Sequence, residues 1–317
     1  MPWLNHPSYV PIRQSLLEDL RRAIPFFKRP PAVVFLCGGK ESLRRARVKQ
    51  LLEQRPSTFV FLAEDVWREV AALATDEKNL LEIEAFLAKL ADAVIIIVES
   101  PGTIAELGAF AISDPLRAKL IPILSEEFQT ERSFINDGPV RSVDRDSTFK
   151  PCIFTKLDPI LACSLDLSER LQRIPKPWGR GLSLVDLGES GKEQLFFIAD
   201  LVGIIGPASA EQIAYYVRAL LGDAPTTELK ALLALGVATK LISKQNIAIG
   251  PLRQQGNRIA LYYSLLGVQA IGSFPGTATR HPIDFSRHRA RVLSFLQRHP
   301  PAARALEAIW GQTQHAS

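Results

Sequence analysis

The sequence predicts an α/β protein, with a parallel sheet covered by helices on both faces in its first half and a mostly helical second half. Before residue 125, short apolar runs alternate with stretches of helical periodicity, which is the pattern of strand–helix–strand units. After residue 190, three helix-like stretches come before short β-like pieces. A chain of 317 residues accommodates two domains, which we place at residues 1–170 and 182–317.

Strands of the first half are predicted where a short apolar run ends at turn-forming residues. The four runs span residues 32–37, 58–62, 93–98 and 119–124. Helical periodicity predicts helices over residues 40–53 and 79–90, and a third helix that begins at Thr103. Alternation of this kind indicates a parallel sheet, because a helix must carry the chain back before the next parallel strand can begin.

Three helices and a small ribbon are predicted in the second half. The helices span residues 192–205, 209–221 and 226–235, and the ribbon lies within residues 241–265. Three helices followed by a ribbon is the order of a winged helix-turn-helix. We therefore expect a winged-helix-like domain, although a generic helical domain would have turn residues at similar positions. The two halves are joined by a stretch of weak periodicity that ends in a hinge, Pro175–Gly181.

The net charge of +5 is concentrated in the second half of the chain. Residues 176–317 carry 15 Lys and Arg against 9 Asp and Glu, whereas the first 175 residues are nearly balanced. A basic half indicates an anionic partner such as nucleic acid, although a solvated surface explains the excess about as well. The candidate nucleic-acid contacts are arginines near the C-terminal end, namely Arg280, Arg287, Arg289 and Arg291.

Several classes of protein are not expected from the composition. No apolar run is long enough to span a membrane, and the first residues lack the pattern of a secretory signal. The three cysteines have neither a metal-ligand nor a disulfide spacing, and the five scattered histidines add no metal motif. We therefore expect a cytoplasmic protein with reduced thiols and without a bound metal or cofactor.

The candidate catalytic residue lies in residues 95–111, IIIVESPGTIAELGAFA, where a predicted strand runs into a Ser-Pro-Gly turn. Thr103 and Glu106 have the spacing of a capping box, in which Glu106 would only close the helix start. Strand ends of a parallel sheet also bind ligands, and Gly38 and Gly39 after the first strand should open on the same crevice. A carboxylate held there stays ionised, which suits a nucleophile. The residues alone leave both roles of Glu106 open.

A resemblance to a known family comes from residues 90–111, LADAVIIIVESPGTIAELGAFA. This stretch resembles the nucleoside deoxyribosyltransferase family and related N-glycosidases, which share an A-D pair, an apolar strand and a G-T-x-x-E-x-G-x-A pattern. The same stretch resembles the deoxyribosyltransferase-like effector subunits of bacterial retrons even more closely. Residues 33–39, VVFLCGG, and residues 133–139, SFINDGP, support the resemblance. It covers most of the chain and implies a Rossmann-like catalytic domain followed by a winged-helix-like domain.

The resemblance also implies roles for individual residues. Glu106 would be the nucleophile that attacks the anomeric carbon of a ribosyl or deoxyribosyl group. Asn136 and Asp137 are candidates for sugar or base contacts, although Asn-Asp-Gly is equally a turn signal. The transferases commonly carry an Asp just before the Gly-Thr pair, where this chain has Glu-Ser-Pro, so hydrolysis or another nucleotide substrate such as NAD is open. Backbone and hydroxyl groups of five residues would line the pocket: Gly38, Gly39, Ser100, Gly102 and Thr103.

Partners follow from the same resemblance. It implies a toxic effector in antiphage defence that is restrained by the retron reverse transcriptase and its msDNA. The transferase family commonly assembles its sites between subunits, which would make the protein a homo-oligomer. The competing interpretation is a nucleotide-sensing, DNA-binding protein that holds a ligand without turnover, with Glu106 only a helix cap.

Overall fold

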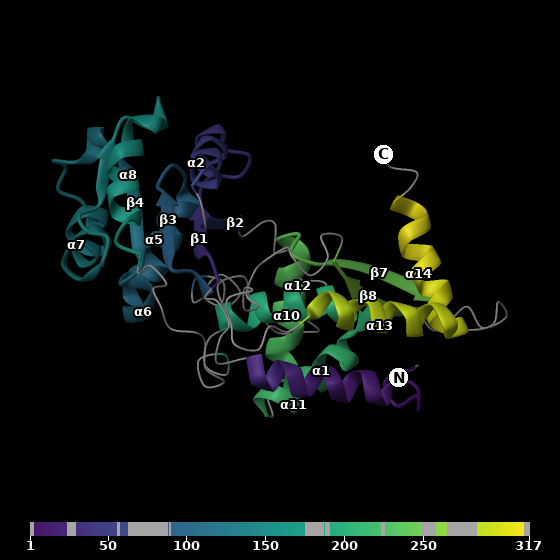
Figure 1. The fold of residues 1–317 in the computed structure, drawn as a ribbon. Coiled ribbons are helices and arrows are strands. Elements are labelled where there is room, and N and C mark those ends of the chain that lie inside the picture. Colours follow the sequence, from purple (N-terminus) through teal and green to yellow (C-terminus); the bar gives the residue numbers. More distant parts are fainter. Residues whose placement is uncertain are drawn as a thin grey trace. The chain divides into compact units, whose positions relative to one another are not determined.

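The chain forms two compact units in the computed structural model (Figure 1). The sheet unit is Pro31–Pro177, and the helical unit combines Met1–Pro30 with Trp178–Ser317. The first 30 residues thus belong with the C-terminal part, whereas the sequence placed residues 1–170 in one domain. The structure describes residues 3–23, 30–55, 58–62, 88, 90–174, 187, 191–222, 226–248, 258–264 and 284–313.

The sheet unit contains a five-stranded sheet in which all neighbouring strands are parallel. Its order is β2-β1-β3-β4-β5, so the chain leaves β1 toward one edge and returns on the other side of β1 at β3. This confirms the predicted parallel sheet and places a topological switch point, where such folds bind ligands, between β1 and β3. The strands are β1 (Ala32–Cys37), β2 (Thr58–Leu62), β3 (Ala93–Ile97), β4 (Leu120–Ser125) and β5 (Ile153–Thr155).

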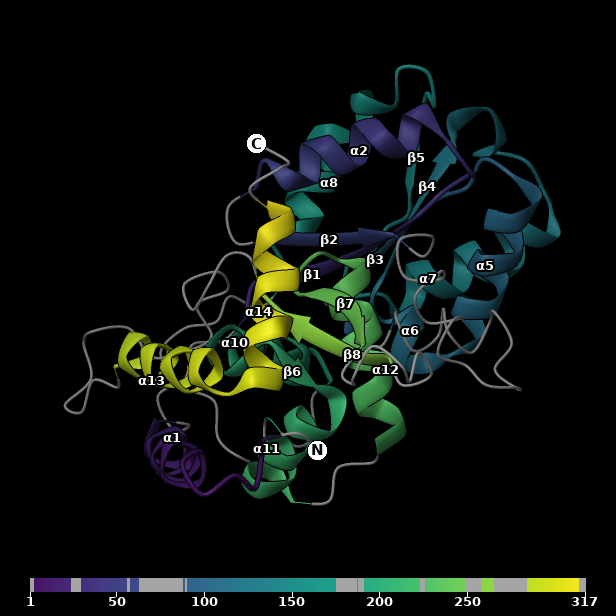
Figure 2. The same cartoon turned by 90° about the vertical axis from the view of Figure 1, so that its right-hand side faces the viewer.

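Helices cover both faces of this sheet (Figure 2). On one face, α2 (Leu43–Glu53), η4 (Ile160–Cys163) and α8 (Ser164–Leu171) share a buried apolar core with β1, β3 and β4. On the other face, α5 (Pro101–Ile112) contacts β3 and β4. The two faces explain why the central strands are continuous apolar runs: all of β3 is buried, with no polar alternation.

Short helices complete the sheet unit. They are α6 (Asp114–Arg117), the 3-10 turn η2 (Glu126–Phe128), the π-helical turn η3 (Asn136–Val140) and α7 (Arg141–Asp146). The helix predicted over residues 79–90 lies outside the described residues except for Ala88 and Leu90, which are both helical.

The helical unit is built around α10 (Gly191–Ile205), in which every residue from Gln194 onward is buried. A small antiparallel sheet of order β6-β8-β7 accompanies it. The three predicted helices and the ribbon are present, and the mostly helical second half is confirmed. The remaining elements are α1 (Val10–Ala23), β6 (Ala208–Ser209), α11 (Ala210–Leu221), α12 (Thr226–Ala238), β7 (Ser243–Ala248), β8 (Arg258–Tyr263), α13 (Phe285–Arg298) and α14 (Pro300–Thr313).

The helical unit includes α1 because this helix is amphipathic. Leu16, Leu17 and Leu20 lie on one side of it and are buried, and α1 contacts α11 and α13. Burying three leucines contributes several kcal/mol of hydrophobic free energy, which holds the N-terminal segment against elements nearly 200 residues or more away along the chain.

Three general properties follow from the part of the chain that the structure describes. None of its helices is long and apolar enough to cross a membrane. It contains no group of three or more His, Cys, Asp or Glu arranged to hold a metal ion. The three cysteines are buried and outside disulfides.

Candidate functional site

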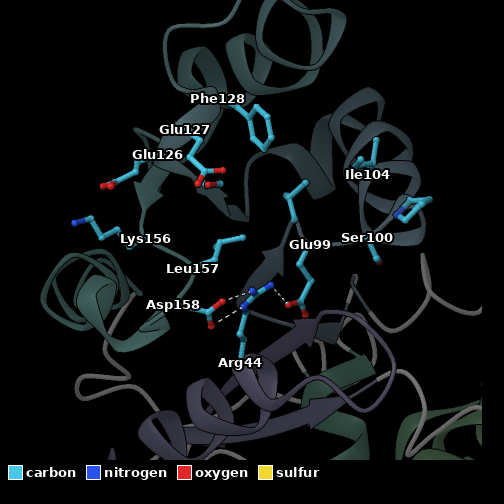
Figure 3. Close-up of a pocket in the computed structure, with 13 residues that line it drawn as sticks. Arg44, Glu99, Ser100, Ile104, Glu126, Glu127, Phe128, Lys156, Leu157 and Asp158 are labelled. Carbon is cyan, nitrogen blue, oxygen red and sulfur yellow. Dashed lines mark hydrogen bonds and ion pairs between the residues drawn. The ribbon is translucent and has the colours of Figure 1, made fainter.

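A pocket of about 590 Å³ opens at the carboxyl edge of the parallel sheet (Figure 3). The segments after β3, β4 and β5 form it, together with the first turns of α2 and α5. Glu126 and Lys156 lie on the side of the pocket opposite Ser100 and Ile104 (Figure 3). The lining residues are Arg44, Val98, Glu99, Ser100, Pro101, Ile104, Ser125, Glu126, Glu127, Phe128, Lys156, Leu157 and Asp158.

Glu99 lies at the switch point between β1 and β3. Its Oε1 accepts a hydrogen bond from the backbone N–H of Gly39 at 2.9 Å, and its Oε2 lies 3.1 Å from Nη1 of Arg44. The side chain is only 7% exposed. A Cβ at position 39 would lie 3.3 Å from Oε1 of Glu99, so a glycine there leaves room for the carboxylate. Glu99 therefore bridges the predicted crevice between the ends of β1 and β3.

Arg44 links the two sides of the pocket. Its Nε donates to Oδ1 of Asp158 at 3.1 Å, and its Nη2 contacts Oδ2 of the same carboxylate. The hydrogen bonds with Asp158, and then those with Glu99, raise the pKa of Arg44, and Arg44 in turn lowers the pKa of Asp158. The guanidinium is therefore a fixed cation between one buried carboxylate and one that is 73% exposed.

The start of α5 differs from the predicted capping box. The helix begins at Pro101, and Ser100 is its N-cap. The Ser100 Oγ accepts from the N–H of Thr103 at 3.3 Å, and the Thr103 Oγ1 accepts from the N–H of Ser100 at 3.0 Å. The expected box between Thr103 and Glu106 was therefore wrong by one helical turn. Proline favours the first helical position and serine the position before it, and a threonine hydroxyl takes the place usually held by Glu.

Glu106 consequently lies outside the capping box of α5. It is in the second turn of this helix, half-buried, with its Oε2 shielded from solvent. Among the described residues that line the pocket, Ile104 is the nearest to it on the helix. Two residues along an α-helix correspond to a rotation of about 200°, so Glu106 points to the opposite side of α5 from Ile104. Glu106 is accordingly not among the residues that line the described pocket.

The other predicted pocket residues divide by their contacts. Ser100 lines the pocket, whereas Gly39 and Thr103 act from behind it, by holding Glu99 and by capping α5. The carbonyl of Gly38 accepts from Nη1 of Arg45 at 3.2 Å. Gly102 is exposed, and a Cβ there would meet only the Ser100 Oγ at 3.8 Å. A Cβ at position 102 would therefore fit without a clash, so the described structure has no steric need for a glycine there.

Asn136 stabilises a loop beside the pocket. Its Nδ2 donates to the carbonyls of Phe128 and Glu131, both at 2.7 Å. Phe128 is a pocket residue, so Asn136 acts on the pocket by holding this wall. Asp137 is exposed, and its N–H donates to the carbonyl of Ser133 at 2.9 Å. The Asn-Asp-Gly stretch forms a π-helical turn rather than the β-turn that its composition indicates.

None of the pocket's charged residues was among the predicted site residues. Arg44 and Asp158 lie 114 positions apart in the sequence, and no local pattern connects them. Glu126 and Glu127 follow β4 directly, so the rule that ligands bind beyond strand ends could have found them. Lys156 and its neighbours follow β5, a strand that the sequence did not reveal.

The predicted arginines of the helical unit behave differently from one another. Arg287 and Arg291 are exposed on α13. Arg289 is half-buried, and its Nη1 donates to the carbonyl of Ile204 at 3.1 Å and also contacts that of Gly206. Burial lowers the pKa of Arg289 to about 10. The guanidinium of Arg289 thus donates to backbone carbonyls within the protein, so we no longer expect this residue to contact nucleic acid. Arg280 lies outside the described residues.

Comparison with known proteins finds a matching protein family and two similar proteins. A family model described as STM3845 retron effector protein matches residues 40–244. The Escherichia coli "Retron Ec73 putative ribosyltransferase/DNA-binding protein" is 34% identical over 239 residues, which cover 67% of this chain and 75% of that protein. A retron Ec86 protein of the same designation and organism is 34% identical over 148 residues, which cover 45% of this chain and 48% of that protein.

Proposed function

Because the chain belongs to the STM3845 retron effector family, we propose that it is a retron effector whose sheet unit acts on an N-glycosidic bond. The substrate class is a nucleoside or nucleotide such as NAD, and Glu106 is the proposed nucleophile. The observation that carries the proposal is the position of Glu106: it follows the switch-point strand β3, it is half-buried with one oxygen shielded, and the cap of α5 does not use it.

The proposed reaction has two steps. A carboxylate oxygen of Glu106 attacks the anomeric carbon, and the bond between that carbon and the base nitrogen breaks. The electron pair leaves with the base, which takes up a proton, and a glycosyl ester of Glu106 remains. Water, or an acceptor base, then attacks the same carbon, releases the sugar and restores the carboxylate. Hydrolysis and transfer differ only in this second step.

The pocket suits a sugar-containing ligand, which the catalytic and the sensing function both require. The catalytic function also requires that the sugar reach Glu106, which does not line the pocket. The pocket volume of about 590 Å³ lies within the usual range for small-molecule sites. Its carboxylates (Glu99, Glu126, Glu127 and Asp158) outnumber its cations (Arg44 and Lys156). Ionised carboxylates accept hydrogen bonds from hydroxyl groups, so this lining suits the ribose of a nucleoside better than an isolated phosphate.

A second candidate function is favoured by one specific observation. Glu106 points to the opposite side of α5 from the pocket residue Ile104. A protein that binds a nucleotide in the pocket and senses it without turnover would need no contribution from Glu106. In that case the role of the sheet unit is recognition, and the effect on the cell passes through the helical unit or its partners.

The helical unit supports a partner role. Its elements run α10, β6, α11, α12, β7, β8, with β6 and β7 both paired to β8, which is the arrangement expected of a winged-helix-like domain. We propose that this unit binds the msDNA and reverse transcriptase of the retron, and that the assembly restrains a toxic activity in antiphage defence. A cytoplasmic location and a homo-oligomeric state stay predictions from the sequence.

The testing experiment compares wild type with Glu106→Gln. Both proteins are incubated with a panel of nucleosides, nucleotides and NAD, and free base is measured by chromatography. We expect base release by wild type and a loss of at least about a thousandfold in Glu106→Gln, because Gln keeps the size of the side chain but cannot attack. Glu169→Gln on α8 serves as the control, since it makes the same change at an exposed glutamate that does not line the pocket.

Three outcomes separate the alternatives. Base release by wild type alone supports the nucleophile. Equal release by wild type and Glu106→Gln shows that another group attacks. Binding of a panel member to wild type without release of base, followed by calorimetry, favours the sensing function instead.

A further inference from the structure

A second cavity lies within the helical unit, between the N-terminal segment and α13. It has a volume of about 800 Å³, and α1 and α13 contact each other beside it. We call it the α13 groove. Its lining residues are His6, Ser8, Ile12, Arg287, Ala290, Arg291, Ser294, Phe295, Arg298, His299 and Pro300.

The lining residues of the α13 groove include three arginines and neither Asp nor Glu. Arg287, Arg291 and Arg298 are exposed, and their spacing of four and seven residues places them along one face of the helix. Arg291 donates to the hydroxyl of Ser15 at 3.3 Å, and Arg298 to the carbonyl of Ser294 at 3.1 Å. These are neutral acceptors, so the three positive charges attract an anion along the groove.

Aromatic rings form one wall of the same groove. The ring centroids of His6, Phe295 and His299 lie between 5.1 and 5.5 Å from one another. Phe295 is buried, while both imidazoles are half-buried and reach the groove surface. Burial, and then the neighbouring His6, lowers the pKa of His299, which favours the neutral form of that ring. A neutral ring face beside a row of arginines is the combination that holds unpaired bases and their phosphates.

The usual recognition helix offers less charge. In a winged-helix-like order α12 would occupy that position, and its sequence carries one lysine, Lys230, and one acidic residue, Glu228. By contrast, α13 has four arginines and no acidic residue within its bounds. Phosphate contacts dominate the affinity of proteins for nucleic acid, so α13 is better equipped for such contacts than α12.

We propose that the α13 groove binds a single strand of nucleic acid, with Arg287, Arg291 and Arg298 on successive phosphates and His6 and His299 against the bases. A concave groove with ring faces suits an unpaired strand, because the bases of a duplex are stacked inside and cannot reach the rings. The inference rests on the nucleic-acid partner in the proposed function and is independent of the chemistry of Glu106.

The test measures binding of a labelled oligothymidylate to the full chain by fluorescence anisotropy over a range of NaCl concentrations. The groove variant combines Arg287→Gln, Arg291→Gln and Arg298→Gln. The matched control combines Lys230→Gln, Lys244→Gln and Arg258→Gln, which removes the same charge from α12 and the β7–β8 ribbon. A duplex of equal length serves as a second probe, and thermal unfolding checks that each variant is folded.

We expect the groove variant to bind the oligothymidylate roughly tenfold or more weakly at low salt, with a salt slope reduced by about 2, the value for three lost contacts to a single strand. The control should bind nearly as wild type. Equal binding by the groove variant and wild type would overturn the inference, as would a larger loss in the control or tighter binding of the duplex.

The failure of this inference can be told from failure of the proposed function. If wild type binds neither probe, both the inference and the nucleic-acid partner in the proposed function are wrong. If wild type binds through another surface, only the inference is wrong. Base release by the groove variant should equal that of wild type, because no residue changed in it belongs to the sheet unit.

Discussion

Arginine is used in opposite ways in the two units of this chain. In the pocket of the sheet unit, Arg44 lies between Glu99 and Asp158 and is bound by both carboxylates. In the α13 groove, Arg287, Arg291 and Arg298 line the cavity without a carboxylate among its lining residues. Charge that is matched inside the protein holds a structure in place, whereas unmatched charge at a surface remains available to a partner.

The same contrast occurs within α13 alone. Arg289 points inward and binds the backbone carbonyls at the end of α10, while Arg287 and Arg291 on the same helix are exposed. Four arginines in one basic helix therefore do not form one binding surface. Net charge predicts that a unit has an anionic partner, but it does not identify the residues that reach it.

The largest expected effect comes from Glu99→Ala. This change removes the acceptor for the Gly39 N–H and the buried partner of Arg44. A hydrogen bond to a charged group contributes about 1.5–3 kcal/mol, and a buried donor left without an acceptor adds to the loss. We expect the free energy of unfolding of the sheet unit to fall by about 3 kcal/mol, measured by urea denaturation. A loss below about 1 kcal/mol would show that Glu99 is not what holds the switch point together.

Much of the sheet could be predicted because the central strands of a parallel sheet are buried on both faces. Such strands carry apolar side chains at every position, so a short continuous run such as residues 93–98 is typical of them. The strand β5 has three residues, Ile-Phe-Thr, next to prolines and lysines, so no run was long enough to reveal it. The place of α1 depends on packing against α11 and α13, which no local pattern records.

The site was harder to predict than the fold. Glycines and hydroxyl residues after strand ends indicated the carboxyl edge of the sheet. The described pocket opens at this edge, Ser100 lines it, and the N–H of Gly39 binds Glu99. The position of the cap was wrong because Thr-x-x-Glu matches the usual capping box more closely than Ser-Pro-Gly-Thr does. The group of Arg44, Glu99 and Asp158 comes from three distant segments, so only the assembled sheet brings it together.

An intermediate effect is expected from Arg289→Ala. The change removes donors to the carbonyls of Ile204 and Gly206 and the packing of the alkyl stem. We expect the helical unit to lose about 2 kcal/mol of stability, seen as a lower thermal midpoint. The matched control is Arg287→Ala, two positions earlier on the exposed side of α13, which should leave the midpoint nearly unchanged. Equal losses for both variants would contradict the division of α13 into an inward and an outward side.

The smallest effect is expected from Asp158→Asn, which removes the exposed carboxylate from Arg44 and leaves Glu99 as its partner. Because Arg44 lowers the pKa of Asp158 in the folded protein, the ion pair stabilises the fold above the ordinary Asp pKa of about 4. Its contribution is lost as the pH falls through the lowered pKa, where Asp158 takes up a proton. Wild type should therefore be slightly more stable than Asp158→Asn at pH 7, and the two should converge in acid.

The comparison is made by urea denaturation at several pH values and at low and high salt, with Asp137→Asn as a control for an exposed carboxylate elsewhere in the sheet unit. Screening by salt should reduce the difference at pH 7, as for other solvent-exposed ion pairs. A loss for Asp158→Asn as large as that for Glu99→Ala would mean that the exposed carboxylate, and not the buried one, fixes Arg44. The position of Arg44 would then depend on Asp158, the exposed partner, which a bound ligand could displace more easily than the buried Glu99.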